Sequence, residues 1–376
     1  MLHIITGLET GGAETMLLKL VRHTEARLLT SLVISLRDEG STIGAALCRA
    51  GVPVQCLKLG RSAHSIRSLA MLPSMVRAAA PDIVQGWMYH GNIAALLAAR
   101  AARLAAPVIW NVRQTSYELA NERRFTRALI RLGAPLSRHP RAIIYNSRLS
   151  ASQHRAYGYA ADRERIVPNG FDVDHFHPVL GARAALLREL GLSQPALLVG
   201  LVARFHPMKN HVGFLEAAAL VRRSNPSVHF VLVGRDVDAG NEVLSAAIQR
   251  LDLAGAVHLL GPRTDLPLVN SALDVACSYS SWGDAFPNVI GEAMACGTPC
   301  IVTDVGDAAD IVGDTGIVVP PRSASEMAAA CLRLAAVAPG ERHALGLRAR
   351  DRIVERYTIS AVAQRYAAVY AEALRA

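Results

Sequence analysis

Residues 275–294 read VACSYSSWGDAFPNVIGEAM, and this stretch contains the local pattern from which the fold is inferred. Val275–Cys277 is an apolar run of strand length, and the polar residues after it predict a loop. A helix is expected to begin at Pro287 or Asn288, because proline is favoured in the first helical turn. A short buried strand that leads through a loop into a helix is the repeating unit of parallel α/β sheets.

The same alternation of apolar runs and helical patterns extends through the chain. The expected strands are Leu2–Thr6, Leu32–Leu36, Ile83–Gln85, Val108–Val112 and Ala142–Asn146 in the first half, and Leu197–Ala203, His229–Val233, Val257–Leu260, Val275–Cys277, Cys300–Thr303 and Gly316–Val319 in the second. Turn-bounded runs rich in β-branched residues predict parallel sheets covered on both faces. Two sets of strands predict an α/β protein of two doubly wound, Rossmann-like domains, with ligands at the carboxyl ends of the strands and in the cleft between the domains.

A turn signal marks the boundary between the two sets. Val167-Pro168-Asn169-Gly170 favours a turn, and Phe171–Pro178 has neither helical nor strand periodicity. The predicted domains are 1–167 and 168–356. The chain closes with a helical pattern from about Ile359, whose apolar positions are Val362, Tyr366, Val369 and Tyr370.

Composition excludes several classes of protein. The first residues lack the charged and apolar regions of a signal peptide, and Arg100 and Arg103 interrupt the longest apolar stretch, Ile93–Trp110. That stretch predicts a buried helix and strand, since a membrane span needs about 20 apolar residues. The six cysteines show no metal-binding spacing, so we expect a cytoplasmic protein with reduced thiols.

The net charge of +9 is concentrated in the first half. Residues 1–167 carry 22 Lys/Arg and 10 Asp/Glu, whereas residues 168–356 carry 16 and 20. Within the basic half, Asn121–Arg141 interleaves six arginines with apolar residues, which is typical of helices on anionic membrane surfaces. A peripheral position on the cytosolic membrane face is therefore expected, and the alternative is an ordinary surface helix with an arginine-rich outer face.

Glycines follow the first expected strand. In Gly7–Glu14, Gly11 and Gly12 precede a helix, so the backbone can approach a ligand while the helix N-terminus offers free N–H groups. This arrangement suits a phosphate or a polar sugar. Its G-x-x-x-G-G spacing differs from the dinucleotide pattern G-x-G-x-x-G. A plain tight turn is the alternative.

Two cations follow the first strand of the second half. Arg204 and Lys209 lie five residues apart in a loop before a helix, and both can reach a diphosphate at the edge of the sheet. Cations placed there in advance would stabilise the charge that a diphosphate leaving group gains in the transition state. The alternative is that both are solvated surface charges.

Two carboxylates flank the start of the helix in the opening stretch. Asp284 precedes that helix and Glu292 lies about one turn into it, close to several backbone N–H groups. Carboxylates accept paired hydrogen bonds from neighbouring hydroxyls, so the arrangement suits a polyhydroxylated ligand. The alternative is that Asp284 caps the helix and Glu292 is solvated.

These motifs together resemble a known family. GGAE (11–14), VPNGFD (167–172), ARFHPMKNH (203–211) and DAFPNVIGEAMACGTPCIVTDVG (284–306) are similar, in order and spacing, to the retaining glycosyltransferases of family 4, which have the GT-B fold. The resemblance covers essentially the whole chain. It implies a donor held mainly by the C-terminal domain, an acceptor on the N-terminal domain, a C-terminal helix (357–376) that returns to the first domain, and no metal.

The resemblance also implies roles for individual residues. Arg204 and Lys209 would hold the donor diphosphate, and with Asp284, which would contact the transferred sugar, they form the expected catalytic set. The other expected donor contacts are Gly11 and Gly12, Gly234 and Arg263 near the base, the amides of Phe286, Asn288 and Val289, and Glu292 at the ribose hydroxyls.

The chain departs from the family pattern at two positions. The residue at position 284 is usually Glu, and Asp284 is one methylene shorter. Many members carry a histidine where this chain has Arg113, which cannot act as a base near neutral pH and is expected to bind an acidic group of the acceptor. His90, which also follows a strand, is a second candidate for acceptor contact, and a structural role is equally open.

Two aspartate pairs have D-x-D spacing. We interpret Asp172/Asp174 and Asp236/Asp238 as turn residues, because they fall in an expected linker and an expected loop. No metal ligand set and no cofactor are therefore expected.

The sequence thus predicts a retaining glycosyltransferase that uses a UDP- or GDP-linked sugar. The expected acceptor is a glycan or polyprenyl-linked saccharide in surface polysaccharide synthesis, and no nucleic acid partner is expected. Two alternatives stay open: a catalytically weak or silent sugar-nucleotide-binding protein, and a sugar-nucleotide 2-epimerase of the same architecture.

Overall fold

A computed structural model describes residues 1–9, 11–23, 30–37, 42–60, 64–115, 124–192 and 196–375, the side chains of 64–67 excepted. The chain divides into two units, which are considered separately. Unit 1 comprises Met1–Gly170 and Ile359–Ala376, and unit 2 comprises Phe171–Thr358. The divisions at 170 and 358 fall three and two residues after the positions expected from the sequence, 167 and 356.

Unit 1 is built on a parallel seven-stranded sheet in the order β3-β2-β1-β4-β5-β6-β7. Its strands are β1 (Leu2–Ile5), β2 (Leu32–Ser35), β3 (Val54–Cys56), β4 (Val84–Trp87), β5 (Val108–Val112), β6 (Ala142–Tyr145) and β7 (Glu164–Ile166). All five strands expected here are present. The other two, β3 and β7, have three residues each and form the edges of the sheet. Because neither contains a fully buried residue, no apolar run marks them in the sequence.

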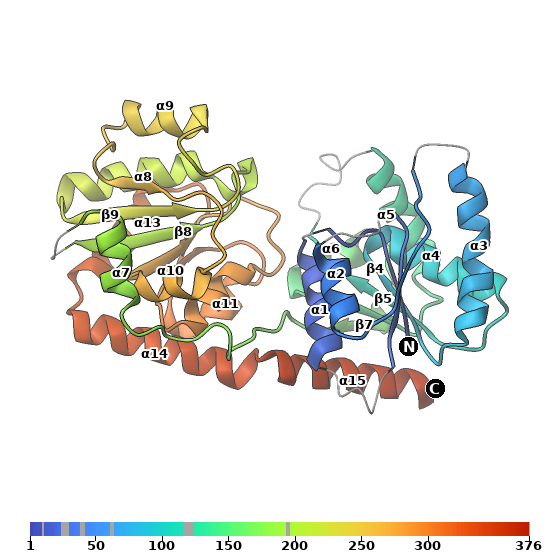
Figure 1. The fold of residues 1–376 in the computed structure, drawn as a ribbon. Helices are drawn as coiled ribbons and strands as arrows, with labels where there is room; N and C mark the ends of the chain where they lie inside the picture. Colours follow the sequence, from blue (N-terminus) through green and yellow to red (C-terminus); the bar gives the residue numbers. More distant parts are fainter. Residues whose placement is uncertain are drawn as a thin grey trace. The chain divides into compact units, whose positions relative to one another are not determined.

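Helices cover both faces of this sheet, because alternate strand residues point to opposite sides. Figure 1 shows the sheet between two groups of helices. One core contains α1 (Gly12–His23), α2 (Thr42–Arg49) and α15 (Ile359–Arg375), and the other contains α3 (His64–Ala79), α4 (Met88–Ala101), α5 (Arg124–Leu136) and α6 (Arg148–Ala156). The apolar stretch Ile93–Trp110 is confirmed as a buried helix and strand, α4 and β5. Among the helices that the structure describes, none is both long enough and apolar enough to cross a bilayer.

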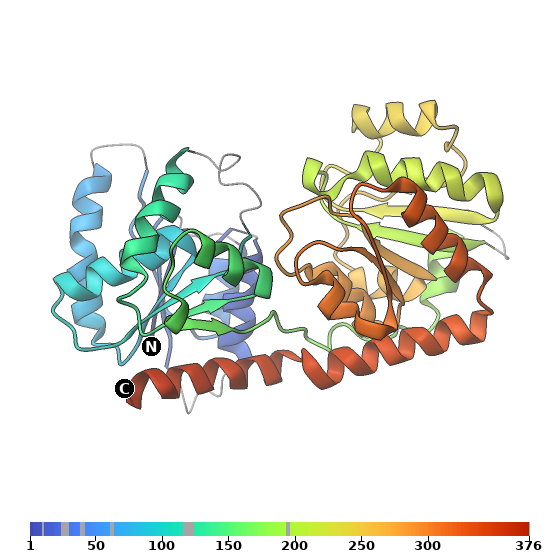
Figure 2. The same cartoon turned by 180° about the vertical axis from the view of Figure 1, so that it is seen from behind.

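The last helix belongs to unit 1 although it follows unit 2 in the sequence. The four apolar positions named above for α15 are all buried in the core of unit 1. The Tyr370 hydroxyl donates a hydrogen bond to Gln85 Oε1 of β4 at 2.7 Å. The expected return of the C-terminal helix to the first domain is therefore confirmed, and the same helix is seen from behind in Figure 2.

Unit 2 repeats the design with a parallel six-stranded sheet in the order β10-β9-β8-β11-β12-β13. The strands are β8 (Leu197–Val202), β9 (Val228–Val233), β10 (Val257–Leu259), β11 (Val275–Ser278), β12 (Cys300–Thr303) and β13 (Ile317–Val319), all expected from the sequence. One face is covered by α8 (His211–Ser224), α9 (Glu242–Arg250) and α13 (Ala324–Ala336). The other is covered by α7 (Ala182–Glu189), α10 (Leu266–Ala272), α11 (Asn288–Ala295), α12 (Ala308–Val312) and α14 (Pro339–Arg356).

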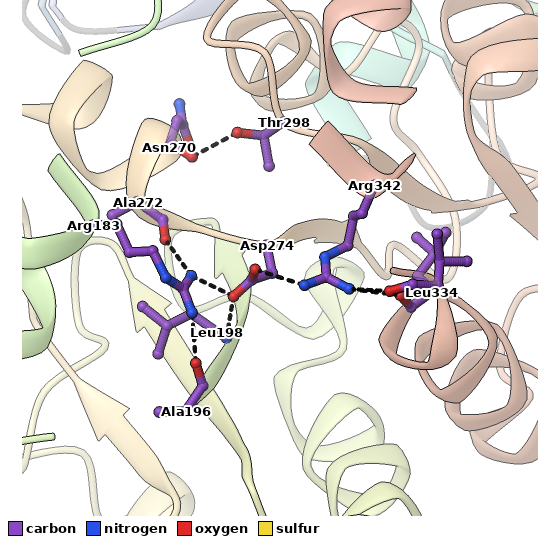
Figure 3. Close-up of polar contacts among 10 residues, drawn as sticks. Arg183, Ala196, Leu198, Asn270, Ala272, Asp274, Thr298, Leu334 and Arg342 are labelled. Atoms are coloured by element: carbon purple, nitrogen blue, oxygen red, sulfur yellow. Dashed lines mark hydrogen bonds and ion pairs between the residues drawn. The ribbon is translucent and has the colours of Figure 1, made fainter. Parts of the chain in front are cut away.

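A half-buried carboxylate joins several elements of unit 2 at the amino-terminal edge of this sheet. Asp274, directly before β11, accepts hydrogen bonds from Arg183 of α7 at 2.5 Å, from Arg342 of α14 at 3.1 Å and from the Leu198 amide of β8 at 2.8 Å (Figure 3). The same two guanidinium groups also donate to backbone carbonyls, including those of Ala196 and Leu334. One aspartate thus connects two helices and the two central strands.

Candidate functional site

The strand order of unit 2 reverses between β8 and β11, and ligands of open α/β sheets bind at such switch points. The loops that leave these two strands contain the expected catalytic residues, and they contact each other directly. The Ser281 amide donates a hydrogen bond to the Met208 carbonyl at 2.8 Å. The fold therefore brings together two segments that are about 75 residues apart in the sequence.

The centre of this contact is an ion pair between two of the expected catalytic residues. Lys209 Nζ lies 2.5 Å from Asp284 Oδ2, and the Ser280 hydroxyl donates to the same oxygen. Both charged side chains are 15% exposed. Among the described residues Asp284 Oδ1 has no hydrogen-bond partner, so one carboxylate oxygen is held by protein and the other is available to a ligand.

Arg204, the second cation of the loop, differs from Lys209 in its surroundings. Its side chain is exposed and forms no ion pair or hydrogen bond with any residue that the structure describes. Its positive charge nevertheless affects the neighbouring His206. Burial, followed by the charges of Arg204 and Lys209, lowers the pKa of His206, so this imidazole is neutral near pH 7. The loop thus combines one paired cation, one available cation and a neutral histidine.

The backbone of the carboxylate loop is fixed by a close approach from the segment after β12. Gly306 has a φ of 65°, and a Cβ there would lie 1.8 Å from the Asp284 carbonyl oxygen. The Asp307 amide also donates to the Ala285 carbonyl at 3.0 Å. Only glycine meets both the left-handed conformation and the contact. The position of Asp284 is therefore set from two sides.

Helix α11 begins at Asn288 with Pro287 as its N-cap and no side-chain cap, so the alternative that Asp284 caps this helix is wrong. Phe286 is buried and stacks on Phe171, with ring centroids 6.1 Å apart. Asn288 and Val289 begin the first turn of this helix, as the sequence predicts. Glu292 lies one turn further along, as its spacing predicts, and its side chain is half-buried.

Gly234 and Arg263, which the sequence places near the nucleotide base, lie in the segments after β9 and β10. Their structural environments differ. Gly234 has a φ of 154°, and a Cβ there would lie 2.1 Å from the Ala203 carbonyl oxygen, so glycine permits the close packing of two strand ends. The Arg263 guanidinium is already engaged by Asp265 and Glu189. Hydrogen bonds to these carboxylates raise the pKa of Arg263. Its side chain thus stabilises the loop after β10, and its role toward a base stays a prediction.

Unit 1 has its own switch point, between β1 and β4. Gly11 immediately precedes α1 and Gly12 begins it, as the glycine motif predicts. His90 lies in the first turn of α4, which follows β4 without a loop, and Met88 adopts a φ of 60° at this sharp turn. Burial, followed by the charge of Arg37, lowers the pKa of His90. Its neutral imidazole packs against Phe125, with ring centroids 5.4 Å apart.

Arg113, expected to bind the acceptor, has protein partners in unit 1. Its guanidinium donates to the Tyr366 hydroxyl at 2.7 Å and to Asn111 and Asn169. It therefore links β5 to α15 and to the segment before Gly170. The structure gives Arg113 a structural role that the sequence did not reveal, and its contact with an acceptor stays a prediction.

Ser280 is the site residue that sequence reasoning missed. A hydroxyl two residues after a strand end and four before the carboxylate was the available signal, but serines are common in loops. In the described part of the chain, no group of three His, Cys, Asp or Glu side chains is placed to hold an ion, and independence from metal stays a prediction. Asp172 and Asp238 accept hydrogen bonds from nearby backbone amides, as expected of turn residues.

Comparisons with known proteins agree with this architecture. Residues 196–336 match the family described as glycosyl transferases group 1, and residues 10–175 match glycosyltransferase family 4. The chain belongs to the family 4 glycosyltransferases. Its two doubly wound units have the GT-B fold, in agreement with the structure of Anabaena HepE in complex with UDP, which superposes with a TM-score of 0.84 at 22% identity and 99% coverage of both chains.

Curated relatives share part of the sequence. A D-inositol 3-phosphate glycosyltransferase of Segniliparus rotundus is 33% identical over 62% of this chain and 52% of its own length. The UDP-Gal:alpha-D-GlcNAc-diphosphoundecaprenol alpha-1,3-galactosyltransferase of Escherichia coli is 33% identical over 37% of this chain and 36% of its own length. The chain thus spans about half, or less, of the length of these relatives.

Proposed function

We propose that this protein is a retaining glycosyltransferase in which unit 2 binds a nucleotide diphosphate sugar and unit 1 binds the acceptor. The observation that carries the proposal is the Lys209–Asp284 ion pair at the switch point of the second sheet, beside the exposed Arg204. When the bond between the sugar and the diphosphate breaks, its electron pair stays on the diphosphate oxygen. Two cations near that oxygen stabilise the transition state, in which its negative charge grows, more than they stabilise the ground state.

The donor and acceptor follow from the relatives as further parts of the proposal. UDP is the preferred nucleotide because HepE was crystallised with UDP and with UDP-glucose, and GDP is the alternative. A polyprenyl-linked saccharide in surface polysaccharide synthesis is the proposed acceptor, on the analogy of the Escherichia coli galactosyltransferase. The inositol phosphate relatives make D-inositol 3-phosphate a necessary member of any acceptor panel.

Nucleotide release from a panel of UDP- and GDP-sugars, measured with and without these acceptors, tests the proposal. Release that depends on the acceptor, with the anomeric configuration of the product retained by NMR, is expected in EDTA as well as in Mg²⁺. A silent binding protein would bind a nucleotide sugar without releasing nucleotide. An epimerase would convert one nucleotide sugar into another. Activity that disappears in EDTA and returns with Mg²⁺ would refute the metal-independent form of the proposal.

The carboxylates are expected to differ in their kinetic roles. Asp284→Asn should lower kcat more than it raises KM, because the proposed contact of Asp284 is with the sugar whose charge changes. Glu292→Gln should mainly raise KM for the donor, because a ribose contact exists in both ground and transition states. Steady-state kinetics with varied donor concentration measures both effects.

Asp284→Glu is the matched control, since it keeps the carboxylate and restores the residue usual in the family. It is expected to retain most of kcat. A kcat defect confined to Glu292→Gln, with Asp284→Asn close to wild type, would reverse the two assignments.

Membrane contact through residues 121–141 is a further proposal. Within the described part of this segment, α5 exposes Phe125 and Leu132, which are 67% and 49% exposed and lie seven residues apart on one face. Arg124 and Arg131 are exposed beside them, and the predicted contribution of Arg123 lies outside the described residues. Exposed apolar side chains next to arginines suit an anionic bilayer surface.

Sedimentation with vesicles tests this proposal. Binding is expected to require phosphatidylglycerol and to weaken at high salt, because each basic residue near an anionic surface contributes about 1 kcal/mol that salt screens. Phe125→Ser with Leu132→Ser should weaken binding at unchanged charge. Equal binding to phosphatidylcholine vesicles, or no binding to either, would contradict the proposal.

A further inference from the structure

A cavity of about 330 Å³ lies at the amino-terminal edge of the first sheet. It is lined by the C-terminal half of α4, the connection from α4 to β5, the residues before β6 and the 3-10 turn Ala161–Arg163. The candidate residues of unit 1 follow the carboxyl ends of β1, β4 and β5, so this cavity is at the opposite edge of the sheet. It belongs to neither of the sites proposed above for donor and acceptor.

Positive charge dominates the lining. Arg100, Arg141, Arg163 and His139 line the cavity together with apolar residues such as Leu96, and no carboxylate of the described residues lines it. The side chains of Arg100 and Arg141 make no ion pair or hydrogen bond within the described parts of the chain. Guanidinium groups that gather in one recess repel one another, and an anion relieves that repulsion.

Arg163 reaches the cavity from a third segment of the chain. Its Nε lies 3.1 Å from Asp162, whose carboxylate is 72% exposed and thus largely solvated. An ion pair with so exposed a carboxylate contributes little, so the Arg163 guanidinium keeps the capacity to bind a further anion.

Helix capping does not account for this cluster. Arg100 is in the last turn of α4, where a cation interacts favourably with the helix dipole. However, the last carbonyls of α4 already accept backbone hydrogen bonds, from Ala102 to Ala98 and from Leu104 to Ala99. Arg141 and Arg163 come from other segments and are not part of that helix end.

We propose that this cavity binds a phosphate group. Arginine matches phosphate geometry with paired hydrogen bonds, and three arginines from separate segments converge on one recess. The cavity volume is at the lower end of the usual range for ligand sites, which suits a small phosphate ester or a phospholipid headgroup. The proposal does not depend on glycosyl transfer.

Titration calorimetry with inorganic pyrophosphate, using the full chain, tests the proposal for a free phosphate. All proteins carry Arg204→Ala and Lys209→Ala, so that the two cations proposed to hold the donor diphosphate do not contribute. Arg100→Gln with Arg163→Gln should weaken binding at least about tenfold, because charge-assisted hydrogen bonds are lost. The matched control is Arg22→Gln with Arg49→Gln, which removes the same charge from exposed helix ends away from the cavity and should leave the affinity unchanged.

Vesicles containing phosphatidic acid distinguish the lipid source from the free one. If the ligand is a headgroup, sedimentation with these vesicles should fall for the Arg100/Arg163 pair and persist for the Arg22/Arg49 pair, whereas pyrophosphate binds none of the proteins. Substitution of Phe125 and Leu132, on α5, should not affect this difference between the two arginine pairs. Equal behaviour of both pairs in both assays would overturn the proposal. Circular dichroism confirms that each variant is folded.

Discussion

Lys209→Ala is expected to lower kcat by about 10²–10³-fold, the loss typical when one donor to a developing anion is removed. Arg204→Ala should have an effect of the same order, since both cations are proposed to face the leaving diphosphate. The fold should persist, because Arg204 is exposed and the Lys209 side chain packs within a loop and outside the core clusters. Single-turnover kinetics at saturating donor isolates the chemical step.

The controls separate chemistry from general charge effects. Arg223→Ala removes an exposed cation in the last turn of α8 and should leave kcat unchanged. Near wild-type kcat in either Arg204→Ala or Lys209→Ala would disprove the proposed diphosphate contact for that residue.

The ion pair adds a quantitative expectation for combined variants. Because Lys209 and Asp284 are in contact, the effects of Lys209→Ala and Asp284→Asn should not add, and the double variant should lose less activity than the product of the two single losses. Strict additivity would mean that the contact is absent in the working enzyme. Lys209→Arg keeps the charge and is expected to recover part of kcat.

Asp274→Ala is expected to destabilise unit 2 by about 3–5 kcal/mol, the cost of removing the shared partner from a largely desolvated ion-pair network. The variant would leave Arg342, which is 9% exposed, without its carboxylate, together with Arg183 and the Leu198 amide (Figure 3). Asp274→Asn preserves the shape and part of the hydrogen bonding, so a smaller loss is expected.

Hydrogen-exchange mass spectrometry can locate the effect in one unit. Peptides from β8 and β11 should exchange on the order of 10²–10⁴-fold faster in Asp274→Ala, whereas peptides from β1 and β4 should be unchanged. Asp351→Ala is the matched control, because Asp351 is an exposed residue of α14 and should cost less than about 0.5 kcal/mol. Unchanged protection of β8 and β11 would show that the network does not stabilise unit 2.

The sequence was sufficient where structure depends on local pattern. Buried strands such as β8 and β12 are short, turn-bounded runs of apolar residues, and the start of α11 at Asn288 follows from Pro287. The short edge strands β3 and β7 were not predicted, because neither buries enough surface to require an apolar run.

The chemical types at the site were also readable, because parallel sheets carry their ligands at the carboxyl ends of strands. Arg204, Lys209 and Asp284 all follow such ends, as the sequence predicts. How these side chains are arranged around one another could not be predicted from the sequence. The sequence led us to treat Lys209 and Asp284 as separate contacts to a diphosphate and a sugar, and in the structure they bind each other.

By itself, then, the sequence determined the buried strands, the two-domain α/β class and the family, because these depend on periodicity and on motifs whose residues are neighbours in the chain. The tertiary structure alone decided which strands lie side by side, and so paired Lys209 with Asp284. It likewise brought Arg113 into hydrogen-bonding distance of Tyr366, 253 residues away, and Asp274 into hydrogen-bonding distance of two arginines. The physical reason is that a charged side chain takes whichever partner the packing brings within hydrogen-bonding distance, and the packing order of the strands is not encoded in any local pattern.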